Sequence, residues 1–278
     1  MKFEQQFLRA CGVLSAWLLC GCTSVVNRVA FLPDRTYTVS DDLLPAGVRR
    51  VFIPTDDGEK LEALIATPPG DARPAKLVLY FHGNAGNISQ RVHQLDAMAQ
   101  VTQAVVLGLG YRGYGASTGS PSERGIYHDA EAALRHAMTE LGYVENQIVL
   151  CGISLGSAVA VNTAMDRNLA GVILVTPMTS GRELARDHGR GGMAWVAGGA
   201  FDSLSRVPRL RAPVLVIHGT LDEVIPYRMG QQLFAAIPTR KQFVTIDGAR
   251  HNNVAYVDPR RFWAAIRDFV ETTKPAPD

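Results

Sequence analysis

Residues 147–151 read QIVLC, residues 152–156 read GISLG, and residues 157–165 read SAVAVNTAM. An apolar run thus passes through a G-x-S-x-G turn into a helix-compatible segment, the strand–turn–helix context that gives this motif its meaning. So tight a turn strains its central residue, which requires small residues around Ser154. The hydroxyl would then stand at a helix N-terminus, where developing negative charge is favoured. We predict that Ser154 is a nucleophile; the alternative is a tight turn without chemistry.

A serine nucleophile needs a general base, and three histidines follow Ser154 in the chain. His251 comes after the apolar run 243–246, on a loop at the carboxyl end of a predicted strand, where catalytic groups collect in open α/β sheets. His218 closes another apolar run and is typical of a packed strand-end residue. His188 lies in a Gly- and Arg-rich stretch that is typical of a surface loop. We therefore predict His251 as the base.

The base in turn needs a carboxylate to orient it, and in this arrangement the acid lies between the serine and the histidine in the chain. Asp222 follows the apolar run 214–218 through Gly219-Thr220-Leu221, so it lies on a loop that corresponds to the loop of His251. Asp247 is the alternative, but it directly precedes Gly248 and is typical of a turn cap. We predict Asp222 as the acid.

An oxyanion hole requires two backbone N–H groups, one from the residue after the nucleophile and one from the loop after the third strand. Leu155 follows the nucleophile. The third apolar run ends in HGNAGN, residues 82–87, where glycines let backbone amides approach a substrate oxygen. We predict Asn84 as the second donor, and loop-shaping hydrogen bonds for His82 and Asn87.

Apolar runs and helical periodicities alternate over the body of the chain. Strands are expected at 51–53, 61–66, 76–81, 104–107, 147–151, 172–175, 214–217 and 243–246. Helices are expected at 89–100, 121–141, 155–165, 229–236 and 259–273. Runs that are apolar on both faces suit parallel strands covered by helices, and Asp57-Gly58 predicts a hairpin between the first two strands. The predicted fold class is α/β, a mostly parallel, doubly wound sheet with an antiparallel N-terminal edge.

Composition and motif context exclude several classes of function. The 278 residues include 28 Lys and Arg against 26 Asp and Glu, and contain no cluster of five or more basic residues. A nucleic-acid partner is therefore not expected. Residues 108–113 (GLGYRG) match a dinucleotide fingerprint, but a loop follows them instead of a helix, and four predicted strands precede them. With neither HExxH nor paired Cys/His spacing, no metal and no cofactor are expected.

The N-terminus is typical of an export signal. A basic start and a short apolar run, residues 11–19, lead into Leu19-Cys20-Gly21-Cys22, which resembles a bacterial lipobox with Cys22 as the lipid-modified residue. We predict a lipoprotein signal peptide over residues 1–21, with an uncleaved anchor or an ordinary buried helix as alternatives. Thr23 after the cysteine favours the outer membrane, on its periplasmic side, if the host is Gram-negative.

Cleavage before Cys22 would leave Cys151 as the other cysteine of the mature chain, so no disulfide is predicted. Residues 22–47 are expected to form a tether or an irregular lead-in, and residues 48–273 a single domain. The lipid would anchor the protein at the cell envelope, with the membrane as its partner.

The assembled motifs resemble the α/β-hydrolase superfamily in their identity and order: FHGNAGN, GYRGYGASTGSPSERGIYHDAEAAL, GISLGS, HGTLDEVIP and GARHNN. More closely, residues 48–272 resemble the BEM46/ABHD13-like and ABHD17-like serine hydrolases. The resemblance implies an α/β-hydrolase fold without a cofactor. It also implies that Ser154 is the nucleophile, Asp222 the acid and His251 the base. The implied oxyanion donors are Asn84 and Leu155.

Two features depart from the pattern of those relatives. They commonly have Asp where this chain has Gly110, ahead of YRGYG. Many of them also have a substantial lid where residues 177–211 are short and Gly-rich, so we expect at most a small flap. Four apolar residues of this segment would either face an acyl group or simply cover the core: Met193, Trp195, Ala197 and Phe201.

Together these residues predict a serine hydrolase that cleaves an ester, thioester or amide through an acyl-enzyme. Small-molecule or acyl-chain substrates at the cell envelope are expected. The alternative is a non-catalytic envelope lipoprotein that uses the same fold for binding. The sequence leaves the acyl group, the leaving group and the oligomeric state open.

Overall fold

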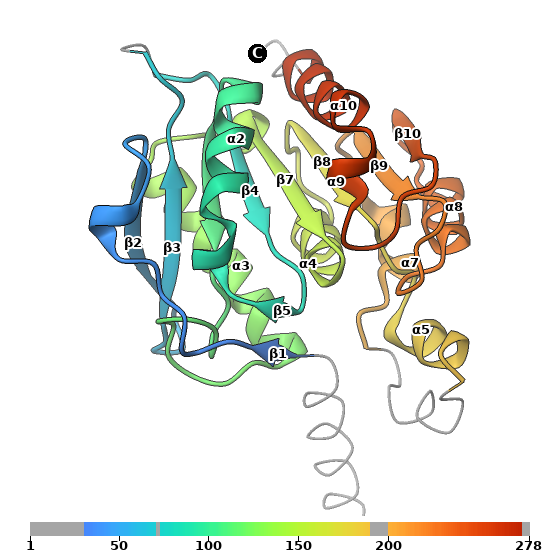
Figure 1. The fold of residues 1–278 in the computed structure, drawn as a ribbon, viewed down its shortest axis with the longest axis horizontal. Coiled ribbons are helices and arrows are strands. Elements are labelled where there is room, and N and C mark those ends of the chain that lie inside the picture. The colour runs from blue at the N-terminus through green and yellow to red at the C-terminus, as the bar shows by residue number, and fades with distance from the viewer. Residues whose placement is uncertain (1–30, 71–72, 190–199, 274–278) are drawn as a thin grey trace, which may run out of the picture.

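The structure, a computed structural model, describes residues 31–70, 73–189 and 200–273 (Figure 1). The predicted signal peptide and Cys22 lie outside these ranges, as do three residues of the predicted flap: Met193, Trp195 and Ala197. None of the helices in the described ranges has the length and apolar character that crossing a membrane requires.

An eight-stranded sheet forms the centre of the molecule, in the order β10-β9-β8-β7-β4-β6-β3-β2. The strands from β10 to β6 are parallel to one another, whereas β3 is antiparallel to both β6 and β2. The bounds are β2 (Val48–Pro54), β3 (Lys60–Ala66), β4 (Leu77–Phe81), β6 (Val105–Leu109), β7 (Ile148–Ile153), β8 (Gly171–Val175), β9 (Val214–Gly219) and β10 (Lys241–Ile246). The predicted mostly parallel sheet with an antiparallel N-terminal edge is confirmed.

Burial along each strand follows its position in the sheet. Every residue of β4, β6, β8 and β9 is buried, because helices cover both faces of these central strands. In the edge strand β10, buried residues alternate with less buried ones, and the other edge strand, β2, is also partly exposed. The apolar runs 76–81, 104–107, 172–175 and 214–217 therefore lie at the centre of the sheet, whereas the apolar run 243–246 forms an edge strand that is only partly buried.

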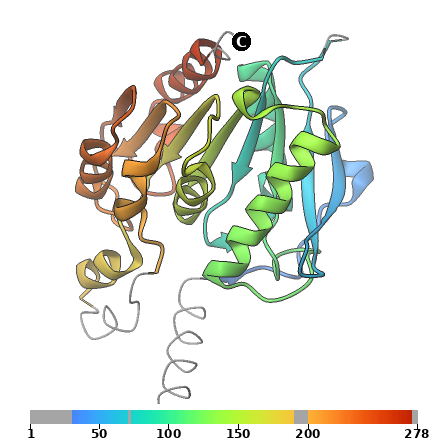
Figure 2. The same ribbon diagram turned by 180° about the vertical axis from the view of Figure 1, so that it is seen from behind.

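Helices pack on both faces of the sheet (Figures 1 and 2). One face carries α2 (Val92–Thr102), α9 (Val254–Val257) and α10 (Pro259–Thr272), and the opposite face carries α3 (Glu123–Thr139), α4 (Leu155–Ala164) and α8 (Tyr227–Ala236). Helix α10 shows how sequence directs this packing: Pro259 begins it, and Phe262, Ile266 and Phe269 lie on one buried stripe. The shorter helical turns are Asp41–Leu43, Ile88–Arg91, Glu145–Gln147 and Val207–Arg209.

The described part of the predicted lead-in, residues 31–47, lies on the domain surface. Its first element is β1 (Leu32–Pro33), which pairs in parallel with β5 (Ala85–Gly86) just beyond the end of β4. Phe31 is buried and packs edge-on against Phe201 at a centroid distance of 5.9 Å. Neither β1 nor β5 was predicted from the sequence, because two residues are too few to show the alternation of apolar and polar positions that marks a strand.

Short helices lie within the predicted flap, residues 177–211. Helix α5 (Gly181–Asp187) precedes residues 190–199, and α7 (Ser203–Arg206) follows them. Phe201 is almost fully buried between the rings of Phe31 and Tyr127. Of the two roles expected for Phe201, the structure therefore gives it the role of covering the core.

A buried carboxylate anchors the loop that follows β6. The fully buried Glu62 accepts hydrogen bonds from Arg50 Nε and from the Ala116 N–H, each at 2.9 Å. The Gly110 N–H donates to the Glu62 carbonyl oxygen at 2.8 Å, and a Cβ added at Gly110 would lie 2.8 Å from the same oxygen. An aspartate at this position would require the backbone to move, and in this chain Glu62 holds the loop.

Candidate active site

Ser154 stands alone between a strand and a helix, as the motif predicts. Strand β7 ends at Ile153, α4 begins at Leu155, and Ser154 between them has φ +54° and ψ −117°. Its N–H donates to the Val175 carbonyl oxygen of β8 at 2.9 Å, which fixes the turn to the neighbouring strand. A non-glycine residue at such angles is strained, and such strain is characteristic of functional turns.

Two glycines let the chain pass through this turn. A Cβ added at Gly156 would overlap the Phe81 carbonyl oxygen at the end of β4 and would lie 2.7 Å from the His82 carbonyl oxygen. A Cβ added at Gly152 would overlap the backbone of Gly156 itself. The start of α4 is therefore pressed against the end of β4, and only glycine fits between them.

The three residues predicted from separate loops meet in one chain of hydrogen bonds. His251 Nε2 lies 3.1 Å from Ser154 Oγ, although the two residues are 97 positions apart. On the other side of the ring, Nδ1 lies 2.9 Å from Asp222 Oδ2 and 3.1 Å from Oδ1. Because a carboxylate only accepts, Nδ1 carries the proton, and Nε2 is left to accept from the serine hydroxyl. The structure therefore brings Ser154, His251 and Asp222 together in the order expected of a nucleophile, a base and an acid.

Asp222 is held as a buried anion. Its side chain is fully buried, and Oδ1 accepts from the N–H groups of Val224 (2.9 Å) and Ile225 (2.7 Å). Burial alone would raise the pKa of Asp222, but hydrogen bonds from His218 and His251 outweigh it and hold the pKa well below its usual range. The carboxylate thus stays charged and accepts the Nδ1–H of His251.

The three alternatives for the acid and the base, Asp247, His188 and His218, all lie in the described part of the chain and make no hydrogen bond to Ser154. Asp247 is exposed and precedes Gly248, which has φ +71°, in agreement with a turn role. His188 is exposed, and its Nε2 lies 2.8 Å from the Val224 carbonyl oxygen. His218 is fully buried, as expected of a strand-end residue, but its Nε2 also lies 3.3 Å from Asp222 Oδ2. The sequence does not predict the contact between His218 and Asp222, because a histidine at the end of an apolar strand is already explained by packing in the core.

The two predicted oxyanion donors belong to the two segments that meet at Ser154, the start of α4 and the loop after β4. Leu155 is the first residue of α4, where an N–H has no partner within the helix. Asn84 follows Gly83, where an added Cβ would lie 3.6 Å from Ser154 Cβ. His82 is fully buried, burial lowers its pKa to about 3, and its Nδ1 lies 2.7 Å from the Gly83 carbonyl oxygen. The expected loop-shaping role of His82 fits this contact.

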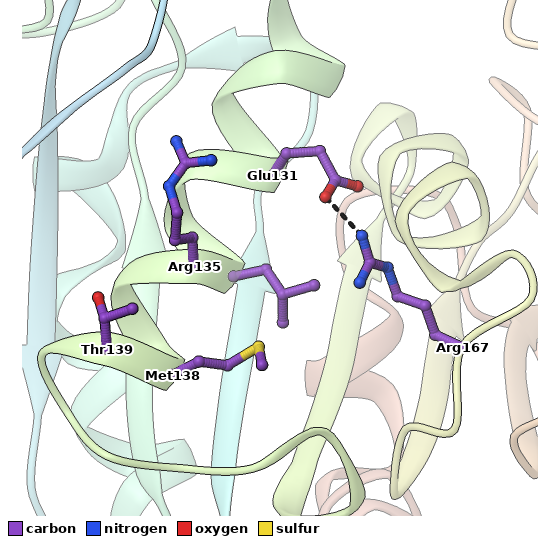
Figure 3. A pocket seen from close by; sticks show the side chains of 6 residues that line it. Glu131, Arg135, Met138, Thr139 and Arg167 are labelled. Atoms are coloured by element: carbon purple, nitrogen blue, oxygen red, sulfur yellow. Dashed lines mark hydrogen bonds and ion pairs between the residues drawn. The ribbon is translucent and has the colours of Figure 1, made fainter.

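A separate hollow lies on α3, away from these residues (Figure 3). Arg167, from the loop after α4, reaches over it and pairs with Glu131 at 2.6 Å and with Glu145 at 2.8 Å. The hollow is lined by Glu131, Leu134, Arg135, Met138, Thr139 and Arg167 and contains none of the predicted site residues. We therefore place the candidate active site at the carboxyl ends of β4, β7, β9 and β10, where the three hydrogen-bonded residues meet.

Comparison with known proteins now identifies the family. Residues 72–205 and 197–255 match the family model described as serine aminopeptidase, S33. The chain is 32% identical to the α/β-hydrolase domain-containing protein aho-3 of Caenorhabditis elegans, over 84% of this chain and 74% of that protein. It is 35% identical to an uncharacterized protein of Mycobacterium tuberculosis, over 89% of this chain and 88% of that protein. The chain belongs to the α/β-hydrolase family.

Solved structures agree with this α/β-hydrolase fold. An esterase of Pyrococcus furiosus, Pf2001, superposes with a TM-score of 0.72 at 16% identity, over 87% of this chain and 97% of that chain. Est1E from Butyrivibrio proteoclasticus, solved with ferulic acid, gives a TM-score of 0.68 at 20% identity, over 80% and 98%. At these identities the likeness establishes the fold, and the chain is an enzyme of this α/β-hydrolase family.

The tight contact at Gly156 generates a stability prediction. We expect Gly156→Ala to lower the free energy of unfolding by about 3 kcal/mol, because the added methyl must displace backbone atoms at the end of β4. Gly83→Ala is the matched control for stability, since its methyl would meet the nearest atom at an ordinary 3.6 Å. Urea denaturation measures both; equal midpoints for the two variants would contradict the account of this turn.

Proposed function

We propose that this α/β-hydrolase cleaves a carboxylic ester, thioester or amide through an acyl-enzyme on Ser154. The observation that carries the proposal is the continuous hydrogen-bonded series Ser154 Oγ–His251–Asp222, with a 3.1 Å contact between the serine oxygen and Nε2. A serine hydroxyl is a weak nucleophile on its own, and an oriented, neutral imidazole is the group that activates it.

In the first half of the proposed reaction, Ser154 Oγ bonds to the substrate carbonyl carbon while its proton passes to His251 Nε2. The ionised Asp222 holds the Nδ1–H and stabilises the imidazolium that forms. The carbonyl oxygen, now negative, is bound by the N–H groups of Leu155 and Asn84. The bond to the leaving group then breaks, and the leaving group takes the proton from Nε2.

In the second half, a water molecule attacks the acyl-enzyme. His251 Nε2 accepts the proton of the water, and a second oxyanion forms in the same hole. When it collapses, the bond between Ser154 Oγ and the acyl carbon breaks, the proton returns from Nε2 to Oγ, and the carboxylic acid leaves. No group beyond this chain and water is needed to balance the reaction.

Esters are the first substrates to test, because the structural neighbour Pf2001 of Pyrococcus furiosus is an esterase. A series of p-nitrophenyl esters of rising acyl length would show both whether the protein hydrolyses esters and how long an acyl chain it accepts. Ser154→Ala is the control. Hydrolysis that survives in Ser154→Ala would contradict an acyl-enzyme on Ser154. Wild-type protein that hydrolyses neither these esters nor the corresponding thioesters and amides would favour the non-catalytic binding role.

The role of the base gives a mutational prediction. We expect His251→Ala to lower kcat by several orders of magnitude, because the serine proton then has no acceptor. The variant should still fold but melt at a lower temperature than wild type, because it also removes a hydrogen bond from the buried Asp222 carboxylate. The matched control is His188→Ala, which removes an exposed histidine outside the hydrogen-bonded series. Near-normal turnover in His251→Ala would move the base elsewhere.

We further propose that the mature protein begins at Cys22 and is lipid-anchored at the cell envelope, on the periplasmic side of the outer membrane in a Gram-negative host. The lipobox-like residues 19–22 and Thr23 support this placement. The membrane would then be the partner of the N-terminus, and acyl-chain substrates in the membrane would lie close to the anchored enzyme.

Lipidation predicts a difference between two neighbouring cysteines. We expect Cys22→Ser to abolish incorporation of labelled palmitate in the bacterial host and to leave residues 1–21 attached, as mass spectrometry of the N-terminal peptide would show. Cys20→Ser should leave both lipidation and cleavage intact, because residue 20 lies within the predicted signal. Palmitate incorporation in Cys22→Ser would refute the assignment, and an unlipidated wild type with residues 1–21 attached would favour an uncleaved anchor.

A further inference from the structure

The segment that leads into the domain is bonded to the loop that carries the proposed oxyanion donor. We name residues 31–37 the N-terminal arm. In the parallel pair β1–β5, the Leu32 N–H donates to the Asn84 carbonyl oxygen at 3.0 Å, and the Asp34 N–H donates to the Gly86 carbonyl oxygen at 3.0 Å. The arm therefore contacts Asn84 directly, through a backbone hydrogen bond.

Further bonds fix the arm in place. Asn87 Nδ2, which is buried, donates to the Asp34 carbonyl oxygen at 3.0 Å and to the Tyr37 carbonyl oxygen at 2.6 Å. Arg35 Nε donates to the Gly113 carbonyl oxygen at 2.8 Å, in the loop anchored by Glu62. The arm is thus hydrogen-bonded both to the loop after β4 and to the loop after β6.

The bonds around Asn84 determine where its N–H points. The Gly83 carbonyl and the Asn84 N–H belong to one planar peptide and point in opposite directions, so the contact of 2.7 Å from His82 Nδ1 to the Gly83 oxygen fixes that plane. The next plane is fixed at the Asn84 oxygen, which accepts from the Leu32 N–H and from Tyr114 Oη at 2.7 Å. Only the two backbone dihedral angles of Asn84 lie between these planes, so these three contacts together hold the backbone of Asn84.

We propose that the N-terminal arm positions the oxyanion hole, with Leu32 acting through Asn84 as a positioning residue. The inference rests on the proposed function and deepens it. The Leu32 side chain is 55% exposed, so its contribution comes from the backbone N–H. Oxyanion donors stabilise the charge that develops in the transition state, and the arm should therefore affect kcat and leave KM nearly unchanged.

The arm can be tested at one atom, because proline has no N–H. Leu32→Pro removes the donor to the Asn84 oxygen, and Leu32→Ala removes only the exposed side chain. With the best p-nitrophenyl ester, we expect Leu32→Pro to lower kcat about tenfold and to keep KM within about twofold of wild type. This loss is smaller than the roughly 10²–10³-fold loss in kcat that follows removal of a whole oxyanion donor, because the donor is displaced and not removed. Leu32→Ala should match wild type in both parameters.

A transition-state analogue separates positioning from loss of stability. An alkyl trifluoromethyl ketone adds to a serine Oγ and places an oxyanion in the hole, so its inhibition constant should rise about tenfold in Leu32→Pro, in step with kcat. Asp34→Ala is the second variant, should Leu32→Pro fail to fold. It removes the carboxylate that accepts from the Thr36 N–H and from Gln90 Nε2, and loosens the arm without altering the backbone. It should lower kcat severalfold by the same route.

Several results would overturn the inference. The arm does not position the hole if folded Leu32→Pro keeps the wild-type kcat, or if Leu32→Ala loses as much kcat as Leu32→Pro does. The same conclusion follows if kcat falls in Leu32→Pro but the ketone binds as tightly as it does to wild type. If Leu32→Pro does not fold, wild-type kcat in Asp34→Ala would have the same meaning. An active wild type with these outcomes leaves the proposed function intact, whereas a wild type without hydrolase activity removes both.

Discussion

The close approach of α4 to the end of β4 is the constraint on which the rest of the site depends. Gly156 packs against the carbonyl oxygens of Phe81 and His82 with no room for a side chain. The same contact brings the nucleophile turn at Ser154 beside the loop that begins at Gly83. The proposed attacking oxygen and the proposed oxyanion donor at Asn84 thus share one junction between two central parallel strands, so on this proposal the sheet sets their geometry before any substrate binds.

The second constraint on the site is the stabilisation of the buried Asp222 carboxylate. Asp222 is a buried charge, which is costly unless it is fully hydrogen-bonded, and two backbone N–H groups and two histidines supply those bonds. Its loop and the loop of His251 follow β9 and β10, which are adjacent parallel strands. Their carboxyl ends therefore place the proposed acid and the proposed base side by side, and Ser154 comes two strands further along the sheet.

The sequence was sufficient for the sheet and for the three hydrogen-bonded residues, because unbroken apolar runs identify buried parallel strands and the loops after them carry the chemistry. It was insufficient where the contacts are local to the backbone or depend on distant partners. The pairing of Leu32 with Asn84 involves only main-chain atoms and two-residue strands, so no side-chain pattern records it. Glu62 lies within a run predicted as a strand, and only the folded chain brings Arg50 and the Ala116 N–H to its carboxylate.

The central claim is that Ser154 is an activated nucleophile in the folded enzyme. A fluorophosphonate tests it most directly, since attack by the serine oxygen forms an O–P bond and releases fluoride without requiring the natural substrate. The account predicts a single adduct by intact-protein mass spectrometry at neutral pH, mapped by peptide sequencing to Ser154 and absent from folded Ser154→Ala. Folded wild-type protein that acquires no adduct at Ser154 would contradict it.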